Sequence, residues 1–232
     1  MLSILIWLPL IGALLIGLFP GKITGKQARN GALAVSGVAL LWTIWLFTQF
    51  KLDFGGFQFH EFLTWLPTLG LNYELSIDGL SLLMVGLNSL ITWIAIWSSK
   101  ADLDRPRLFY SLILLVSGGL AGAFLAQNML LFFLLYELEL VPLYLLISIW
   151  GGEKKVYSAT KFLLYTALSG AFILAGFLGT VWLSGASDFT YYAVMGHELP
   201  LVWQYLLLGS LLIGFGIKIP LVPLHTWLPD TY

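Results

Sequence analysis

Residues 129–150 read MLLFFLLYELELVPLYLLISIW, a run of 22 residues in which Glu137 and Glu139 are the only charged side chains. An α-helix needs roughly 20 residues to cross about 30 Å of hydrocarbon, and this run is long enough. Similar apolar runs occupy residues 2–19, 31–50, 79–99, 108–126, 158–187 and 201–219. The sequence therefore predicts an all-α, polytopic membrane protein with seven transmembrane helices.

Composition supports a membrane protein. Of the 232 residues, 59% are hydrophobic and 10% are charged, and the mean hydropathy is +0.91. Soluble domains average about 25% charged residues, so an ordinary water-facing surface is excluded and a lipid bilayer is expected as the main partner. The net charge of −1 gives no reason to expect nucleic acid. The sequence has no cysteine, which excludes disulfides, cysteine-ligated metal sites and iron–sulfur clusters.

Basic residues gather in alternate connections between the spans. The connections after the second, fourth and sixth spans hold only Lys51, whereas the other three hold eight basic residues. These eight are Lys22, Lys26, Arg29, Lys100, Arg105, Arg107, Lys154 and Lys155. Because basic loops stay on the cytoplasmic side of a membrane, the N-terminus is expected on the opposite, positive (p) side. No basic residue precedes the first span, which we interpret as a retained helix rather than a signal peptide.

The long connection at residues 51–78 is rich in aromatic residues and contains Gly55-Gly56 as a turn signal. Its partial alternation predicts a short β-hairpin on the p-side surface. Interfacial aromatic residues that mark the membrane boundary would give the same pattern, and the sequence supports both interpretations.

Four of the 23 charged residues lie inside spans, and each is a candidate for proton transfer. These are Glu137, Glu139, Lys161 and Lys218. A charged side chain at the bilayer centre costs about 2.5–3.5 kcal/mol on insertion scales. Glu137 lies near the middle of its span, and Pro142 leaves the carbonyl of Leu138 without its helical hydrogen bond.

Glu139 follows Glu137 by two positions. At about 100° per residue its side chain points about 200° away. We therefore expect that the two carboxylates cannot serve one site on a regular helix, and contact with a partner subunit is the alternative role for Glu139.

Lys218 is followed by Pro220 and Pro223, which lack the amide hydrogens that would continue the helix. The seventh helix is therefore predicted to break just after Lys218, and broken helices build ion sites in many transporters. His225 follows the break, and imidazole suits a proton relay. The alternative role for Lys218 is that of a lysine at a helix end whose side chain snorkels to the membrane surface. This alternative is stronger for Lys161, because Lys161 lies near the basic end of its span.

Three motifs in order resemble the antiporter-like membrane subunits of complex I. They are FFLLYELELVP at residues 132–142, ATKFLLYT at residues 159–166 and KIPLVPLHTWLPD at residues 218–230. WLPTLGLNY at residues 65–73 and DGLS at residues 78–81 are similar to chain 4 of that family rather than chains 2 or 5. The YELELVP form and the following IWGG are most similar to the cyanobacterial and chloroplast NDH-1 version.

The resemblance implies an inverted-repeat antiporter-like fold. Residues 1–107 would form three leading helices with the loop or hairpin at 51–78, and residues 108–232 most of the first repeat, cut inside its broken helix. It further implies that Glu137 and Lys218 form the central ion pair for proton transfer, with His225 and Lys161 as further proton-transfer residues. Glu139 and Asp78 are secondary candidates.

The function implied by the resemblance is proton translocation within a complex that passes electrons from ferredoxin to plastoquinone. This chain would hold no cofactor, while quinone and iron–sulfur clusters would be bound by the partner subunits. A variant for CO₂ uptake and a thylakoid location with a lumenal N-terminus are further expectations. A subunit of a multisubunit sodium/proton antiporter and an inert structural membrane subunit are the alternatives.

Relatives of this kind are about twice as long, so we expect the sequence to be the N-terminal portion of a longer subunit. Asp230 is followed by Thr231 and Tyr232 where many relatives have Ala-His. One relay histidine of the family is therefore expected to be lacking.

Overall fold

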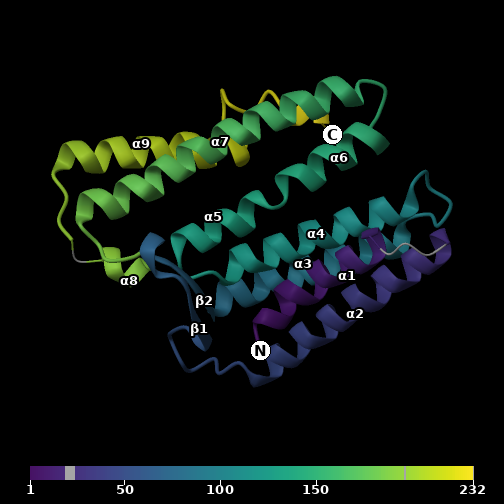
Figure 1. Cartoon of the computed structure of the whole chain (residues 1–232), viewed down its shortest axis with the longest axis horizontal. Helices are drawn as coiled ribbons and strands as arrows, with labels where there is room; N and C mark the ends of the chain where they lie inside the picture. The colour runs from purple at the N-terminus through teal and green to yellow at the C-terminus, as the bar shows by residue number, and fades with distance from the viewer. Residues whose placement is uncertain (19–23, 196, 232) are drawn as a thin grey trace. The chain divides into compact units, whose positions relative to one another are not determined.

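The computed structural model describes residues 1–18, 24–195 and 197–231 (Figure 1). Lys22 and Tyr232, both used in the sequence interpretation, lie outside these residues. Among the described residues, six segments are long and apolar enough to cross a membrane, and they include residues 129–150 counted as a single span. The remaining predicted span is α1 (Ser3–Leu18), which is apolar but has only 16 residues. The predicted number of seven is thus approximate.

The first compact unit comprises Met1–Phe62 and Glu74–Ala126. It contains α1 together with three longer helices. These are α2 (Gly25–Gln49), α3 (Gly79–Ser98) and α4 (Pro106–Leu125). Helix α1 packs against α2 and α4, and α3 packs against the same two helices. The buried core of this unit includes Ala13, Ala32, Ile96, Tyr110 and Leu114.

The second unit comprises Leu63–Tyr73 and Gln127–Tyr232. Its helices are α5 (Met129–Glu137), α6 (Leu140–Trp150), α7 (Lys155–Ser184), α8 (Tyr191–Val194), α9 (Leu201–Lys218) and α10 (Leu228–Thr231). Helix α7 is central, because each of the other five packs against it. Figure 1 shows α7 and α9 side by side, and the interruption between α5 and α6. This arrangement brings α5, α6 and α9 around one helix.

The predicted hairpin is present as strands β1 (Gln58–Leu66) and β2 (Leu71–Ile77), which form a two-stranded sheet. The expected turn at Gly55-Gly56 is wrong, because the strands are joined by a 3₁₀ turn at Pro67–Leu69 and by Gly70. Gly70 has φ 66°, a left-handed conformation that glycine adopts without steric cost. Proline at the start of a turn and glycine in the left-handed position are both turn signals.

Asn128 fixes the start of α5. Its Oδ1 accepts hydrogen bonds from the amides of Leu130 and Leu131, both at 3.1 Å. This is the capping that a helix N-terminus needs, because its first amides have no partner within the helix. The Nδ2 of the same side chain donates to the carbonyl of Gly70 at 3.1 Å. One asparagine therefore joins the hairpin turn to the helix that carries Glu137.

The boundary between the two compact units falls between Ala126 and Gln127, except that the hairpin tip at Leu63–Tyr73 belongs to the second unit. It places α4 with the three helices before it. The predicted boundary between residues 107 and 108 follows the repeat structure of the resembled family, and it stays a prediction.

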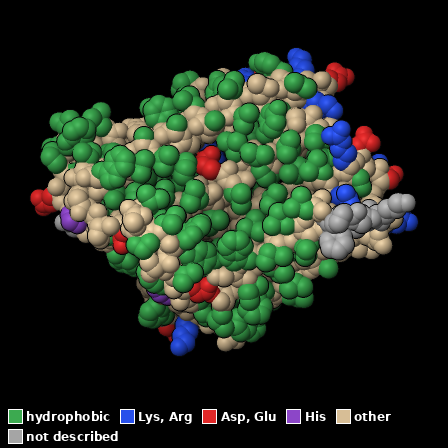
Figure 2. Space-filling view, viewed as in Figure 1, with side chains coloured by type: hydrophobic (Ala, Val, Ile, Leu, Met, Phe, Trp, Pro, Cys, Tyr) green, Lys and Arg blue, Asp and Glu red, His purple; other side chains and the backbone are tan. Residues whose placement is uncertain are grey.

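The outer faces of the helices are apolar. Leu41 and Leu83 in the first unit, and Leu164 and Leu206 in the second, are each more than half exposed. Hydrophobic side chains cover most of the face seen in Figure 2, and most charged side chains lie at its margin. Apolar helices with apolar outer faces need lipid around them, so the chain is an integral membrane protein.

Candidate functional site

The fifth predicted span is interrupted at its acidic motif. Helix α5 ends at Glu137 and α6 begins at Leu140, with a turn at Leu138 and Glu139 between them. Pro142 cannot donate to the carbonyl of Leu138, and helical bonding resumes with the amide of Leu143 and the carbonyl of Glu139 at 2.9 Å. The local defect expected from Pro142 is thus confirmed.

Lys218 is the last residue of α9, and its ammonium group lies between two carboxylates. Nζ is 3.3 Å from Oε1 of Glu137 and 3.3 Å from Oε1 of Glu139. The ring centroid of Tyr136 lies 3.6 Å from the same nitrogen, a cation–π contact. Side-chain exposure is 9% for Lys218 and 13% for Glu139, so this ion cluster is largely removed from solvent.

The expectation that Glu137 and Glu139 cannot serve one site is wrong. It assumed about 100° of rotation at every residue, which holds only while the helix is regular. In the structure both side chains approach the same ammonium group, although Leu138 and Glu139 keep right-handed helical dihedral angles at the turn between α5 and α6. The break at Lys218 predicted from Pro220 is confirmed, since α9 ends at this lysine.

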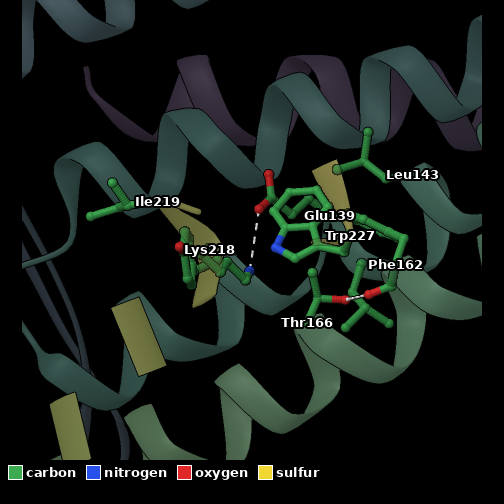
Figure 3. A pocket seen from close by; sticks show the side chains of 9 residues that line it. Glu139, Leu143, Phe162, Thr166, Lys218, Ile219 and Trp227 are labelled. Atoms are coloured by element: carbon green, nitrogen blue, oxygen red, sulfur yellow. Dashed lines mark hydrogen bonds and ion pairs between the residues drawn. The ribbon is translucent and has the colours of Figure 1, made fainter. Parts of the chain in front are cut away.

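A cavity of about 180 Å³ adjoins the ion cluster (Figure 3). Its lining residues come from four helices of the second unit and from the two connections that follow α5 and α9. They are Tyr136, Glu139, Leu140, Leu143, Phe162, Thr166, Lys218, Ile219 and Trp227. Trp227 donates from Nε1 to the carbonyl of Ile217 at 2.8 Å, which holds the segment after α9 against the end of that helix. The cavity reaches both Lys218 and Glu139.

Glu137 has different surroundings from Glu139. A Cβ atom added to Gly170 of α7 would lie 3.0 Å from Cδ and from Oε2 of Glu137, which shows how closely this carboxylate packs on the helix backbone. Its Oε1 is buried and accepts no hydrogen bond among the described residues, although the Lys218 ammonium is within ion-pair distance. Gly170 was not a candidate from the sequence. A glycine at a close helix contact is its only signal.

Lys161 belongs to a separate cluster. Its Nζ donates to Oδ2 of Asp230 and to the carbonyl of Thr226, both at 2.6 Å. The hydroxyl groups of Tyr165 and Thr226 lie 2.8 Å apart. These contacts join α7 to the segment after α9. Asp230 was not singled out from the sequence, and the WLPD motif is the signal that could have found it.

His225 lies between α9 and α10, as the sequence placed it. Its Nδ1 is buried and has no hydrogen-bond partner among the described residues. His225 is not among the residues that line the cavity beside Lys218. Its part in a relay stays a prediction.

Asp78, a secondary candidate, caps α3 in the first unit. Its Oδ1 accepts from the hydroxyl of Ser81 at 2.6 Å and from the amide of Ser81 at 2.7 Å. These hydrogen bonds hold the pKa of Asp78 below its usual range. This reciprocal arrangement is a capping box. Helix capping explains why a carboxylate stands at this position, without a role in proton transfer.

No group of three or more His, Cys, Asp or Glu side chains suited to a metal ion occurs in the parts of the chain that the structure describes. The chemistry that the ion cluster itself offers is proton exchange, because lysine and carboxylate groups can each bind or release a proton.

Residues 126–232 match the family described as "NADH:quinone oxidoreductase/Mrp antiporter, TM". The chain is 42% identical over 233 residues to NAD(P)H-quinone oxidoreductase chain 4 of Synechococcus sp., covering 100% of this chain and 42% of the relative. It is 45% identical over 226 residues to NAD(P)H-quinone oxidoreductase chain 4 1 of Picosynechococcus sp., covering 97% and 42%. The chain thus spans less than half the length of these curated relatives.

Solved structures show the same fold. A chain of respiratory complex I from Thermus thermophilus with bound NADH superimposes with a TM-score of 0.87 at 28% identity, covering 100% of this chain and 46% of that chain. A chain of the Mrp complex from Dietzia sp. gives a TM-score of 0.82 at 18% identity, covering 99% and 25%, and this likeness concerns the fold alone. Over residues 126–232, the chain is therefore similar to the transmembrane family of NADH:quinone oxidoreductases and Mrp antiporters.

Proposed function

We propose that this chain is part of a proton-translocating membrane subunit of an NDH-1-type quinone oxidoreductase, with Lys218 as a proton carrier. One observation carries the proposal: the ammonium of Lys218 lies between Glu137 and Glu139 at the end of a membrane helix. Buried ionisable groups in membrane spans are costly, and they mark proton or ion pathways.

The chemistry of the cluster fits proton translocation because lysine has a neutral form as well as a charged form. A carboxylate 3.3 Å away stabilises the ammonium, and withdrawal of that carboxylate would favour the neutral amine. Opening and closing of the Glu137–Lys218 pair would therefore take up and release a proton. The interrupted helix between α5 and α6 gives Glu137 a segment end on which to move.

The proposal extends to the complex around the chain. The relatives are named NAD(P)H-quinone oxidoreductase chain 4, and they come from cyanobacteria. We propose that other membrane and peripheral subunits bind the quinone and the iron–sulfur clusters, and that this chain carries no redox centre. We further propose ferredoxin as the electron donor, plastoquinone as the acceptor and a role in a CO₂-uptake variant of the complex. A carbonic-anhydrase-like partner among the co-purifying subunits would support the CO₂-uptake variant.

For location we propose a thylakoid membrane with the N-terminus on the lumenal side. The relatives come from cyanobacteria, which supports a thylakoid membrane as the location. The eight basic residues in alternate connections, against one in the others, support the orientation.

The test is Lys218→Arg in the assembled complex. Arginine keeps the positive charge between the carboxylates but does not release its proton in proteins. We expect normal subunit content, residual quinone reduction and loss of proton uptake into sealed vesicles. Lys100→Arg, at an exposed connection, is the matched control and should pump as the unaltered complex does. Unaltered pumping by Lys218→Arg would contradict the proposal.

A subunit of a sodium/proton antiporter is the second candidate, supported by the fold of the Mrp complex chain. It predicts that pumping by the assembled complex depends on sodium. Unaltered transport after joint neutralisation of Glu137 and Lys218 would instead indicate an inert structural subunit.

A further inference from the structure

The two carboxylates beside Lys218 differ in what lies on their other side. Glu139 accepts a hydrogen bond from Nζ of Lys218 at 3.3 Å and lines the adjoining cavity. Figure 3 shows this contact at the cavity wall, with Thr166 and Trp227 nearby. Glu137 does not line that cavity and packs against the backbone of α7 at Gly170. Glu139 therefore lies at the cavity, whereas Glu137 lies outside it against α7, with 19% of its side chain exposed.

The cavity is suited to water. Its volume of about 180 Å³ exceeds the roughly 10–15 Å³ that one water molecule requires by this measure. Three kinds of polar group meet there, from Glu139, Lys218 and Thr166. The hydroxyl of Thr166 donates to the carbonyl of Phe162 at 2.7 Å, so its oxygen lone pairs are available to accept from water.

The charges of the cluster do not balance when every group is ionised. One ammonium then faces two carboxylates, which leaves a net negative charge at a site with little solvent. An uncompensated buried charge is strongly unfavourable, so the cluster has a place for one additional proton on a carboxylate. Glu139, which lines the cavity, can obtain that proton from water there.

We infer that Glu139 transfers protons between water in this cavity and Lys218, while Glu137 holds the lysine from the side of α7. In the transfer step, the O–H bond of protonated Glu139 breaks and an N–H bond forms on the neutral amine of Lys218. The Glu139 carboxylate then takes its next proton from a hydronium ion that reaches it through the cavity water: an O–H bond of the hydronium breaks, an O–H bond forms on Glu139, and a neutral water molecule remains. This inference rests on the proposed function and adds a second carboxylate with a separate role to it.

The test compares Glu139→Gln with Glu137→Gln in the assembled complex. Glutamine preserves the side-chain shape but cannot carry the proton. A positioned proton carrier accounts for about 10²–10⁴-fold in rate, so we expect Glu139→Gln to slow proton uptake by roughly 10²-fold. Glu139→Asp should recover part of the rate. Glu153→Gln, which removes an exposed carboxylate in a connection, is the matched control and should leave the rate unchanged.

Infrared difference spectra separate the roles of the two carboxylates. In D₂O, the carbonyl stretch of a protonated carboxylic acid should shift rapidly in the unaltered complex and in Glu137→Gln. That rapidly shifting band should be absent from Glu139→Gln. Unaltered pumping by Glu139→Gln, or a band lost only from Glu137→Gln, would overturn the inference.

The Lys218→Arg variant distinguishes a failure of the role inferred for Glu139 from a failure of the proposed function. If Lys218→Arg blocks pumping while Glu139→Gln pumps normally, only the role of Glu139 is refuted. If Lys218→Arg itself pumps normally, the proposed function fails and the inference fails with it.

Discussion

Lys218 and Lys161 both lie on membrane helices of the second unit and both meet a carboxylate, yet their surroundings differ. Lys161 pairs with one carboxylate, that of Asp230, whose side chain is 38% exposed. Lys218 pairs with two, and its own side chain is 9% exposed. The Lys161 cluster is therefore electrically balanced and more exposed, whereas the Lys218 cluster is unbalanced and more buried. Balanced, solvated pairs suit attachment of one segment to another, and an unbalanced buried cluster responds to each proton that enters or leaves.

The largest effect is expected from Lys218→Ala. It leaves Glu137 and Glu139 buried without a cation, and removing one partner of a buried ion pair costs about 3–5 kcal/mol. The subunit should dissociate from the complex at a clearly lower temperature, measured by its retention after heating.

Joint replacement of all three groups separates stability from transport. In Lys218→Met with Glu137→Gln and Glu139→Gln no buried charge is left unpaired, so retention after heating should largely recover while pumping stays absent. A triple variant that is as unstable as Lys218→Ala would contradict this account of the cluster.

A smaller effect is expected from Gly170→Ala. The added methyl group would lie 3.0 Å from the carboxyl carbon of Glu137, so the carboxylate or the helix must shift, at a cost of about 1–3 kcal/mol for overpacking. Pumping should fall because Glu137 is displaced from Lys218. Proton uptake into vesicles measures the effect.

Gly209→Ala on α9 is the matched control for Gly170→Ala. No atom lies within 4 Å of the position its Cβ would take, so it should leave pumping unchanged. Equal losses from both alanine variants would show that packing against Glu137 is irrelevant.

The smallest effect is expected from Lys161→Met and Asp230→Asn. Solvent-accessible ion pairs contribute little to stability, so each variant should keep most of the pumping rate and heat stability. The double variant should be no worse than either single variant, as a double-mutant cycle would show. Loss of pumping comparable to that of Lys218→Arg would place Lys161 in the proton path and remove the contrast between the two lysines.

The spans and the proline breaks could be predicted because they depend on local properties. Apolar length defines a membrane helix, and Pro220 removes an amide wherever it occurs, so the end of α9 at Lys218 followed from the sequence. The same reasoning found the defect caused by Pro142. Its consequence for Glu139 was missed, because a helical wheel treats every residue of the span as part of a regular helix.

The partners of the buried groups could not be predicted because they come from distant parts of the chain. Gly170 lies 33 positions from Glu137 in the sequence, and only the packing of α5 on α7 brings them together. Likewise, Asp230 became a partner of Lys161 only through the path that the segment takes after α9. Glu139 was placed among the secondary candidates for a local reason, because a regular helix would direct its side chain away from that of Glu137.

The length of α7 has a consequence for the depth of Lys161. Its 30 residues extend about 45 Å at 1.5 Å per residue, whereas the hydrocarbon layer is about 30 Å thick. Tilt alone would have to reach about 48° to fit this helix, beyond the usual range of 0–40°, so at least one end extends into the headgroup layer. Lys161 lies six residues, or about 9 Å, from the first residue of α7. If the N-terminal end is the one that extends, the lysine lies at headgroup depth, where its charge costs the bilayer little.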